Sequence, residues 1–425
     1  MNEPVSNKYD LSEFLEIEHI ALFQSFRLSG LSHLSVIDRL SHIRCLIHKC
    51  FALLEKSCIN ALIFGGNPHS LADFILARIT SRVGISCYTL QDFPVAPLRS
   101  FVYDIKQSAL PIPNCLASDN FNHSQIKSYA KSLSQYFEKT GRLKFIGSNA
   151  ASRELSPSVT SCSAFYANQE SGLSIYDQII NRYPTDTVEY EFCFSYYSKI
   201  SALSRVHDFN HSLKDTVALF LHVEPEAAVN PGAGLLISQL EIIRLLRTRL
   251  PYSINLLVKE HPSMFVTPLQ KGSDSHKVYR SSMFFNAISS MPGVYWLNPE
   301  TRNSQIFSNC LAAVSCGGTT AFESFVNCCP IAVTGYSPLS TLPEVFELNN
   351  LTSATSKFWN VEEMRTIRKK LSSLSITERF ERMLSTSVPG HPNGPMMLCY
   401  HPTDVELETS QEMLVRSIVK LLSPS

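Results

Sequence analysis

Short apolar runs alternate with helix-like stretches from about Asp215 to about Leu371, and this pattern leaves few possible folds for the chain. The runs are rich in β-branched residues and too short for helices, whereas the stretches between them have apolar positions at helical spacing. This alternation is typical of a parallel sheet covered by helices on both faces, and such sheets bind ligands at the carboxyl ends of their strands. The expected strands are VALFLHV from Val217, INLLV from Ile254, VYWL from Val294, LAAVS from Leu311 and PIAVTG from Pro330.

A shorter pattern of the same kind precedes this region. Ala61 to Phe64 forms an apolar run that ends at a glycine pair, Leu71 to Ile79 has helical spacing, and Ile85 to Leu90 is a second apolar run. This order predicts a strand, a helix and a strand. Apolar spacing between residues 11 and 56 predicts one or two amphipathic helices before them.

The length of 425 residues exceeds what one hydrophobic core usually organises, so we expect more than one domain. The predicted division is a first lobe at 1–205, a second lobe at 206–385, and a tail at 386–425 with a terminal helix that packs back on the first lobe. Residues 112–214 are rich in Ser, Asn and Tyr, and we expect mobile loops and the linker between the lobes there.

Composition excludes several classes of function. Lys plus Arg and Asp plus Glu both number 37, so no global field attracts nucleic acid, and basic residues do not cluster with aromatic ones. No stretch approaches the ~20 apolar residues of a membrane span, and the start lacks the pattern of a signal peptide, which predicts a cytoplasmic location. The twelve cysteines form no CxxC pair, so we read them as reduced core residues and expect no metal.

Two of the loops that follow expected strands carry groups suited to a phosphate-bearing ligand. Residues 222–234 contain Glu224 and two glycines before a helix, which allows close backbone approach to a phosphate, although a simple turn with solvated carboxylates is an alternative. Lys259, His261 and Pro262 follow the next strand. A lysine or histidine there can neutralise a departing phosphate, but such residues are also common as solvated strand ends.

A third loop, SCGGTTAFE, leads from a strand into a helix. Free N–H groups at the start of the helix and two threonine hydroxyls form an anion cradle, and a glutamate on the first turn can accept hydrogen bonds from ribose hydroxyls. A glycine-rich turn with an N-cap threonine explains the start of the helix equally well, but it does not explain the coincidence of the three loops. The candidate residues are Ser315, Gly317, Gly318, Thr319, Thr320 and Glu323.

The first lobe offers candidates for a general base. His69 and Asp73 lie four residues apart at the start of an expected helix, so both can face the same side. An attacking hydroxyl needs a proton acceptor, and imidazole and carboxylate are the usual choices. A first-turn charge that stabilises the helix is the alternative for Asp73.

These motifs, in this order, resemble the capsule polysaccharide biosynthesis family of bacterial glycosyltransferases, which includes the Kdo transferases of capsule export systems. The resemblance covers roughly residues 60–105 and 215–335. It is carried by FGGNPHSLADFILARITSRVGI, HVEPEAAVNP, VKEHP, the segment with Arg280, Ser281, Phe284 and Phe285, GVYWLNP, and the Gly/Thr loop that leads to Glu323.

The resemblance implies a GT-B architecture, in which two Rossmann-like lobes with parallel sheets face a central cleft. The second lobe would bind a nucleotide sugar, CMP-linked donors included, and the first a glycan or glycolipid acceptor. Transfer of a hexosyl, Kdo or sialic-type sugar would proceed with inversion and without metal or other cofactor, because side chains such as Lys259, His261, Thr319 and Thr320 would stabilise the leaving phosphate. Glu323 resembles the ribose-binding carboxylate.

Other functions stay open on the sequence. A polyol-phosphate transferase of the teichoic-acid type shares the GT-B lobe and the His-Pro strand end, and a non-catalytic glycan-assembly subunit would keep the lobe without turnover. A nucleotide-sugar epimerase shares the fold but needs further carboxylates and histidines around the sugar. A lipid-linked acceptor would demand peripheral contact with the inner face of the plasma membrane, which helices near residues 34–56 can supply, with core packing as their alternative use.

Overall fold

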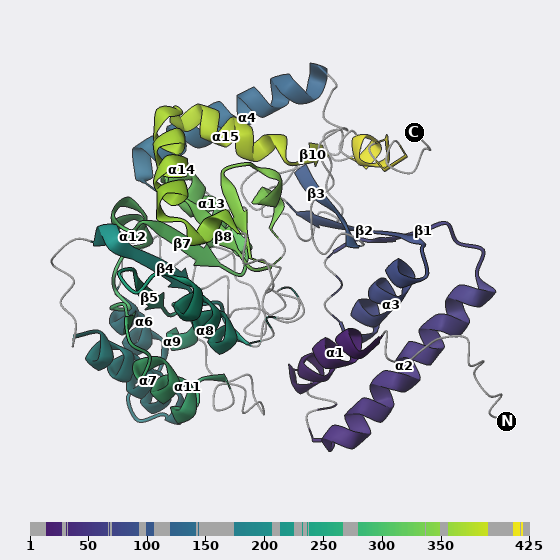
Figure 1. Ribbon diagram of the computed structural model, residues 1–425, viewed down its shortest axis with the longest axis horizontal. Coiled ribbons are helices and arrows are strands. Elements are labelled where there is room, and N and C mark those ends of the chain that lie inside the picture. Colours follow the sequence, from purple (N-terminus) through teal and green to yellow (C-terminus); the bar gives the residue numbers. More distant parts are fainter. Residues whose placement is uncertain are drawn as a thin grey trace.

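The structure is a computed structural model with two lobes and two β-sheets (Figure 1). It describes residues 14–27, 31, 33–66, 68, 70–92, 99–105, 120–141, 143, 174–205, 213–224, 232, 236, 238–266, 279–335, 337–348, 356–389, 411–416 and 418–419. The predicted α/β fold with two lobes is confirmed, and the site predicted in the second lobe can be located on its sheet.

The second lobe is built on a six-stranded parallel sheet in the order β6-β5-β4-β7-β8-β9. The strands predicted from the sequence are all present, and Val345–Glu347 adds one that was not predicted. Their bounds are β4 Thr216–Phe220, β5 Asn255–Lys259, β6 Val294–Trp296, β7 Ala312–Ser315, β8 Ile331–Val333 and β9 Val345–Glu347.

Both faces of this sheet are buried, which explains why its strands are continuously apolar. Alternate residues of β4 enter different cores: Val217 and Leu219 face one side, and Ala218 and Phe220 the other. The first side is covered by α6 Ile175–Arg182, α7 Val188–Arg205, α8 Gln239–Arg249, α9 Ser263–Val266 and α11 Ser282–Ser289. The second side is covered by α4 Asn120–Thr140, α12 Asn303–Asn309, α13 Gly318–Val326 and α15 Ile376–Ser385.

Other elements join these layers. The helix α14 Val361–Ser373 places Met364 in one core and Leu371 in the other. Short 3-10 turns are η4 Leu213–Asp215, η5 Pro338–Thr341 and η6 Lys357–Trp359. Serine side chains fix several helix starts by accepting a backbone N–H of the first turn, as N-caps commonly do. These serines are Ser35, Ser70, Ser174, Ser238, Ser281 and Ser375.

In the described residues, the first lobe combines three helices with a four-stranded sheet. The helices α1 Leu15–Arg27, α2 Val36–Lys56 and α3 Leu71–Arg82 share one core. The sheet has the order β1-β2-β3-β10, with β1 Ala61–Phe64, β2 Ser86–Asp92, β3 Arg99–Asp104 and β10 Val388–Pro389. Only β1 and β2 are parallel, so the expectation of an all-parallel sheet is corrected here. The segment 93–98 is shorter than the roughly twelve residues that a parallel crossover needs, so β3 turns back antiparallel.

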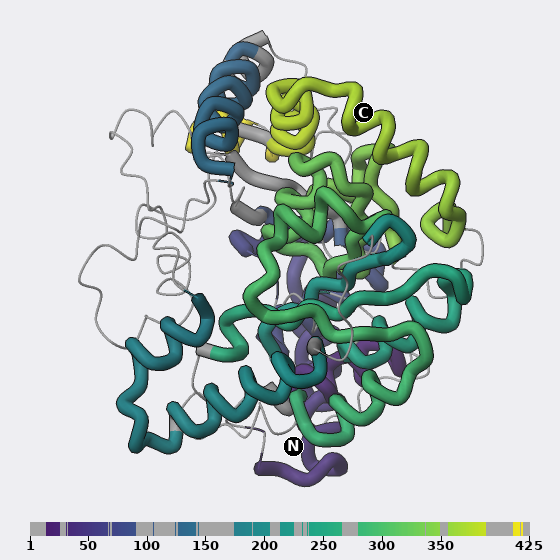
Figure 2. The backbone as a smooth tube through the Cα atoms, turned by 90° about the vertical axis from the view of Figure 1, so that its left-hand side faces the viewer, coloured from purple at the N-terminus to yellow at the C-terminus, as the bar shows by residue number. Residues whose placement is uncertain are grey.

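Two passages between the lobes can be followed in the described residues. After β3 it enters α4, which lies beside α15 in both views and is hydrogen-bonded to it by Thr377 Oγ1 and Ser134 Oγ at 3.0 Å (Figures 1 and 2). After α15, Val388 pairs with Ser100 of the first sheet, so the start of the predicted tail returns to the first lobe. The helical residues 411–416 and 418–419 fall within the predicted terminal helix.

Residues 112–214 are more regular than expected. Three helices lie in the described part of this range, and Ile126, Ile179 and Tyr196 contribute to the cores of the second lobe. These helices precede the predicted boundary at residues 205 and 206, yet they pack on the sheet that follows it. Aromatic and polar residues obscure their helical spacing, and long-range packing stabilises them.

Several of the cysteines are buried free thiols, among them Cys87, Cys310 and Cys316, as expected for core residues. Cys45 and Cys58 are exposed instead. In the described part of the chain no helix is both long enough and apolar enough to cross a bilayer.

Candidate functional site

The candidate site lies where the order of the six-stranded sheet reverses. From β4 the chain builds outward to β5 and β6 on one side, and then returns to place β7, β8 and β9 on the other. Loops that leave the carboxyl ends of the strands diverge at such a switch point, and ligands of open α/β sheets bind in the opening between them. Here the switch point lies between the ends of β4 and β7.

The three loops predicted to bind a ligand converge at this edge. His222 after β4 contacts Ser315 at the end of β7, with 3.0 Å between Nε2 and Oγ. A β-carbon on Gly335, after β8, would clash with the carbonyl of Cys316 and lie 2.9 Å from that of Gly232, so the loops after β4 and β7 both approach this glycine closely. Glu260, after β5, is linked to the loop after β4 by Arg280, which also bonds Glu224 and the carbonyl of His222.

The loop after β7 leads into α13 through two glycines. Gly317 has φ 124° and ψ −144°, and Gly318 has φ 68°, conformations that residues with a β-carbon rarely adopt. Gly317 is the N-cap, so the N-cap threonine considered from the sequence is not present. Because glycine has no side chain, the N-cap residue makes no side-chain hydrogen bond to the first turn. Thr319 and Thr320 are half-buried in that turn. An N-terminus of this kind offers N–H groups to an anion.

His222 lies against this loop. The hydroxyl of Ser315 donates to the carbonyl of Gly317 at 2.7 Å, and the same hydroxyl oxygen lies 3.0 Å from Nε2 of His222. Gln239 fixes the backbone of His222 from both sides, since its Oε1 accepts the N–H at 2.6 Å and its Nε2 donates to the carbonyl at 2.9 Å. Sequence reasoning did not single out His222 or Gln239.

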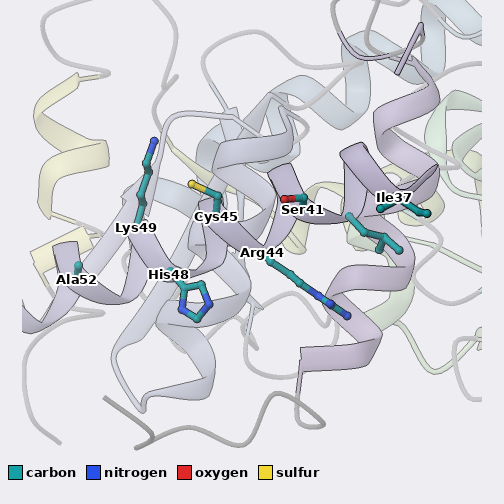
Figure 3. A pocket seen from close by; sticks show the side chains of 8 residues that line it. Ile37, Ser41, Arg44, Cys45, His48, Lys49 and Ala52 are labelled. Atoms are coloured by element: carbon teal, nitrogen blue, oxygen red, sulfur yellow. The ribbon is translucent and has the colours of Figure 1, made fainter. Parts of the chain in front are cut away.

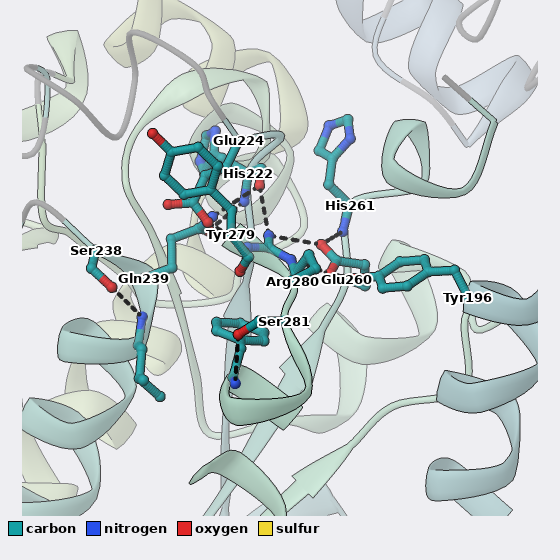
Figure 4. A network of polar contacts seen from close by, with 12 residues as sticks. Tyr196, His222, Glu224, Ser238, Gln239, Glu260, His261, Tyr279, Arg280 and Ser281 are labelled. Atoms are coloured by element: carbon teal, nitrogen blue, oxygen red, sulfur yellow. Dashed lines mark hydrogen bonds and ion pairs between the residues drawn. The ribbon is translucent and has the colours of Figure 1, made fainter. Parts of the chain in front are cut away.

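A buried ionic network ties the ends of β4 and β5 together (Figure 4). Arg280 is ion-paired with Glu224 and with Glu260, where Nε and Oε2 are 2.7 Å apart. The hydroxyl of Tyr196 donates to the same carboxylate of Glu260. Burial lowers the pKa of Arg280, but the two carboxylates more than offset this and hold it well above its usual value. Burial and the charge of Glu260 raise the pKa of Tyr196.

This network changes the role expected for Glu224. The carboxylate was predicted to contact the donor, but it is 4% exposed and its Oε2 binds Arg280, so its charge is already neutralised. The partners Arg280 and Tyr196 were not predicted as site residues. Arg280 stood in a motif of the family resemblance, which was the one available signal, whereas Tyr196 had none.

Lys259 is also placed differently from the prediction. Its side chain is buried, and Nζ donates to the carbonyl of Pro299 at 3.2 Å and to that of Thr301 at 2.6 Å. Burial lowers its pKa to about 8, although the nearby carboxylates of Glu300 and Glu323 act in the opposite direction. Lys259 therefore supports the loop between β6 and α12 in this structure.

That loop leads to a residue that orients Glu323. Asn303 Nδ2 donates to Oε2 of Glu323 at 2.8 Å. Burial raises the pKa of Glu323, while Asn303 and Lys259 lower it. Glu323 is half-buried and lies beyond the first turn of α13, because the helix begins earlier than the sequence pattern indicated.

His261 and Pro262 lie at the end of β5, both half-buried. Nδ1 of His261 accepts the N–H of Ser263 at 3.2 Å, so in the neutral ring the proton is on Nε2. The imidazole points away from Glu260 and Arg280 (Figure 4). Its backbone N–H donates to Oε1 of Glu260 at 2.8 Å.

The predicted base residues of the first lobe are only partly described. His69 lies outside the described residues. Asp73 is exposed in the first turn of α3, where the hydroxyl of Ser70 donates to its Oδ2 at 2.6 Å and its own N–H donates to Ser70 Oγ at 3.1 Å. These are the contacts of a helix start, as in the alternative considered for Asp73.

A separate groove of about 660 Å³ runs along α2 (Figure 3). It is lined by Ile37, Leu40, Ser41, Arg44, Cys45, His48, Lys49 and Ala52. The opposite face of the helix buries Ile43, Ile47 and Phe51 against α1 and α3, which is the core packing considered from the sequence. The groove belongs to the first lobe and contains none of the predicted site residues. Among the described residues no group of three or more His, Cys, Asp or Glu side chains is arranged to hold a metal ion.

Neither known protein families nor curated proteins match this sequence. Solved structures that it resembles include a UDP co-structure of MnaA from S. aureus, at 10% identity and a TM-score of 0.21 over 96% of both chains. UDP-GlcNAc 2-epimerase from Neisseria meningitidis, bound to UDP-GlcNAc, has 9% identity and a TM-score of 0.22 over 96% of this chain and 90% of its own. The glycotransferase of kitacinnamycin has 10% identity and a TM-score of 0.22 over 96% and 95%. Because these TM-scores are low, the fold is described from the strand order of its own sheets.

Proposed function

We propose that this protein is a glycosyltransferase that uses a nucleotide-sugar donor. The observation that carries the proposal is the glycine turn of residues 317 and 318, which starts α13 at the switch point of a parallel sheet. A helix N-terminus at this place suits the phosphate of a nucleotide, and Glu323 lies on the same helix.

The site residues divide the binding task. In the proposal the first turn of α13, with Thr319 and Thr320, binds the phosphate. His261 donates from Nε2 to the same group, because its Nδ1 already accepts the N–H of Ser263. Glu323 accepts from ribose hydroxyls through Oε1, since Asn303 occupies Oε2.

The proposed reaction is a direct displacement with inversion. The acceptor hydroxyl attacks the anomeric carbon, Asp73 or His69 takes its proton, and the bond between the sugar and the phosphate oxygen breaks. The negative charge that develops on the leaving phosphate is stabilised by N–H donors, so the proposal needs no metal. The proposed acceptor is a surface or capsular polysaccharide, or its glycolipid precursor, and the donor class includes CMP-linked sugars.

Nucleotide binding tests the first part of the proposal. Thermal denaturation with CMP, UDP, GDP, CDP and ADP, each with and without magnesium, should show stabilisation by one nucleotide that does not depend on magnesium. The stabilisation should disappear in Glu323→Ala. Absence of a shift with every nucleotide would contradict the proposal and favour a non-catalytic subunit.

Product analysis tests the second part. The expected product contains a new glycosidic bond of inverted configuration and forms only when acceptor is present. A phosphodiester product would instead identify a polyol-phosphate transferase, and conversion of the donor sugar without acceptor would identify an epimerase. Full activity in both Asp73→Asn and His69→Ala would overturn the assignment of the base.

A further inference from the structure

Arg280 makes polar contacts with the ends of two neighbouring strands. Its Nη1 pairs with Glu224 and its Nη2 donates to the carbonyl of His222 at 3.1 Å, both after β4. Its Nε and Nη2 bond the two oxygens of Glu260, after β5, at 2.7 and 3.2 Å. The guanidinium also lies over the ring of Phe284, 4.7 Å from its centre. These contacts use the planar fork of arginine, which a lysine cannot reproduce.

Glu260 connects Arg280 to the candidate site. Its Oε1 accepts the backbone N–H of His261 at 2.8 Å, and its Oε2 accepts the hydroxyl of Tyr196 from α7. The carboxylate is therefore held from two directions, and it holds the residue that carries the imidazole. On the other strand Arg280 bonds the backbone of His222, whose ring is hydrogen-bonded to Ser315 beside the start of α13. Arg280 is thus bonded directly to the backbone of His222, and through Glu260 to the backbone of His261.

We propose that Arg280 is a positioning residue for the candidate nucleotide site, and that Tyr196 assists it by fixing Glu260. Together they set the distance of His222 and His261 from the N-terminus of α13. The inference rests on the proposed function for the identity of the ligand, but the geometry that it describes can be tested without one.

Energetics favour a positioning role over a purely stabilising one. Removing three charges from water is costly, and buried ion pairs add little net stability compared with apolar residues of the same size. Arg280, Glu224 and Glu260 are at most 6% exposed. Such a cluster specifies one arrangement of its surroundings, and here the surroundings are the loops of the switch point.

A matched arginine provides the control. Arg247 of α8 donates to the carbonyls of Ile254, Leu250 and Pro251 at 2.7–3.0 Å, in the loop that precedes β5. It therefore ties backbone at the amino end of the same strand. Arg247→Lys should lower the melting temperature and leave nucleotide affinity unchanged within about twofold.

The experiment compares Arg280→Lys and Tyr196→Phe with Arg247→Lys, using the nucleotide that stabilises the wild type most. Titration calorimetry, at a temperature where circular dichroism shows each variant folded, should give a Kd raised at least about tenfold in Arg280→Lys and less in Tyr196→Phe. A Kd within about twofold of the wild type in both variants would overturn the proposal. If Arg280→Lys does not fold, Tyr196→Phe decides, because it removes a single hydroxyl.

A second readout separates this inference from the proposed function. Ring resonances of labelled histidines should shift for His222 and His261 in Arg280→Lys and Tyr196→Phe, and stay in place in Arg247→Lys. If the wild type binds no nucleotide, the proposed function fails, but shifted ring signals would still support Arg280 as the residue that sets this geometry. Unshifted signals would overturn it.

Discussion

The imidazole of His222 fills the space beside the α-carbon of Gly318, so that a β-carbon at position 318 would lie only 3.0 Å from its Cε1. Gly318 also has φ 68°, where a β-carbon is strained whatever its surroundings. Backbone conformation and close packing therefore both require glycine at the start of α13, and they couple this residue to the end of β4.

Gly318→Ala should consequently displace His222 as well as strain the backbone. We expect a loss of about 1–2 kcal/mol in the free energy of unfolding, as for other residues forced into the left-handed region. Because the first turn of α13 is the proposed phosphate site and Gly318 lies in it, nucleotide affinity should also fall about tenfold. Chemical denaturation and titration calorimetry measure the two effects.

Gly141→Ala is the matched control for this variant. Gly141 has φ 67°, nearly the same strain, but nothing lies within 4 Å of the position of its β-carbon. Gly141→Ala should lower the free energy of unfolding by a similar amount and leave the affinity for nucleotide unchanged. Equal affinities in the two variants would show that the contact between His222 and Gly318 has no part in binding.

Asn303→Asp should weaken nucleotide binding. The amide of Asn303 donates to Oε2 of Glu323, and an ionised aspartate cannot donate. Two neighbouring carboxylates would also repel and raise the pKa of Glu323 further. We expect affinity to fall about tenfold at pH 8 and less at pH 6, measured by calorimetry at both values.

The comparison for this variant is Asn309→Asp. Asn309 is exposed on the same helix, and its amide donates to the carbonyl of Gln305 at 2.8 Å, so the same change of charge occurs away from Glu323. Its affinity should match that of the wild type. An equal loss of nucleotide affinity in Asn309→Asp and Asn303→Asp would show that the negative charge added to α12 weakens binding, and not the lost hydrogen bond to Glu323.

Lys259 should make stability depend on pH in a defined window. Burial lowers its pKa from 10.5 to about 8, so between these values the unfolded chain binds more protons at this position than the folded protein. The unfolding free energy contributed by Lys259 should therefore rise with pH across this window and stay constant below it. The rise should reach up to about 3 kcal/mol.

Urea denaturation of the wild type and Lys259→Met at pH 7.5 and pH 10 measures this effect. The wild type should gain stability relative to Lys259→Met as the pH increases. The difference in stability between the wild type and Lys369→Met, which changes an exposed lysine of α14, should not change with pH. A difference between wild type and Lys259→Met that does not change with pH would contradict the assignment.

Asp73 can be tested for its two roles separately. Asp73→Asn keeps an oxygen that accepts from Ser70, so its melting temperature should change little, whereas Ser70→Ala removes the N-cap and should lose about 1 kcal/mol. If Asp73 is the base, Asp73→Asn loses activity by about 10²-fold or more while Ser70→Ala keeps it. Wild-type activity in Asp73→Asn would leave His69 as the proposed base.

Much of the fold follows from local sequence patterns. The run Ala61–Phe64 coincides with β1, and each strand predicted in the second lobe is present within a few residues. The helices of residues 112–214 were missed for a physical reason. In α7, VEYEFCFSYYSKISALSR, aromatic residues are spread around the helix, so no clear apolar face marks it, and packing of residues such as Tyr196 on the sheet stabilises the helix.

The positions of the candidate site residues were predicted better than the contacts of their side chains. Ser315, Gly317, Gly318 and Glu323 were identified from turn chemistry and the helix that follows, and the structure places them at the switch point. Glu224 and Lys259 were identified by the same reasoning, but their side chains face a buried arginine and two backbone carbonyls. A residue's position after a strand does not reveal which of several neighbours its side chain will meet.

Spacing and turn chemistry over a few residues are enough to predict the alternation of strands and helices, the glycine turn before α13 and the order of the loops. Folding in three dimensions was needed to bring Arg280 between Glu224 and Glu260, His222 against Gly318, and Asn303 to Glu323. These partners are between 20 and 96 residues apart in the chain. They meet because the parallel sheet brings the ends of its strands to one edge, where burial leaves each charge with few partners to choose from.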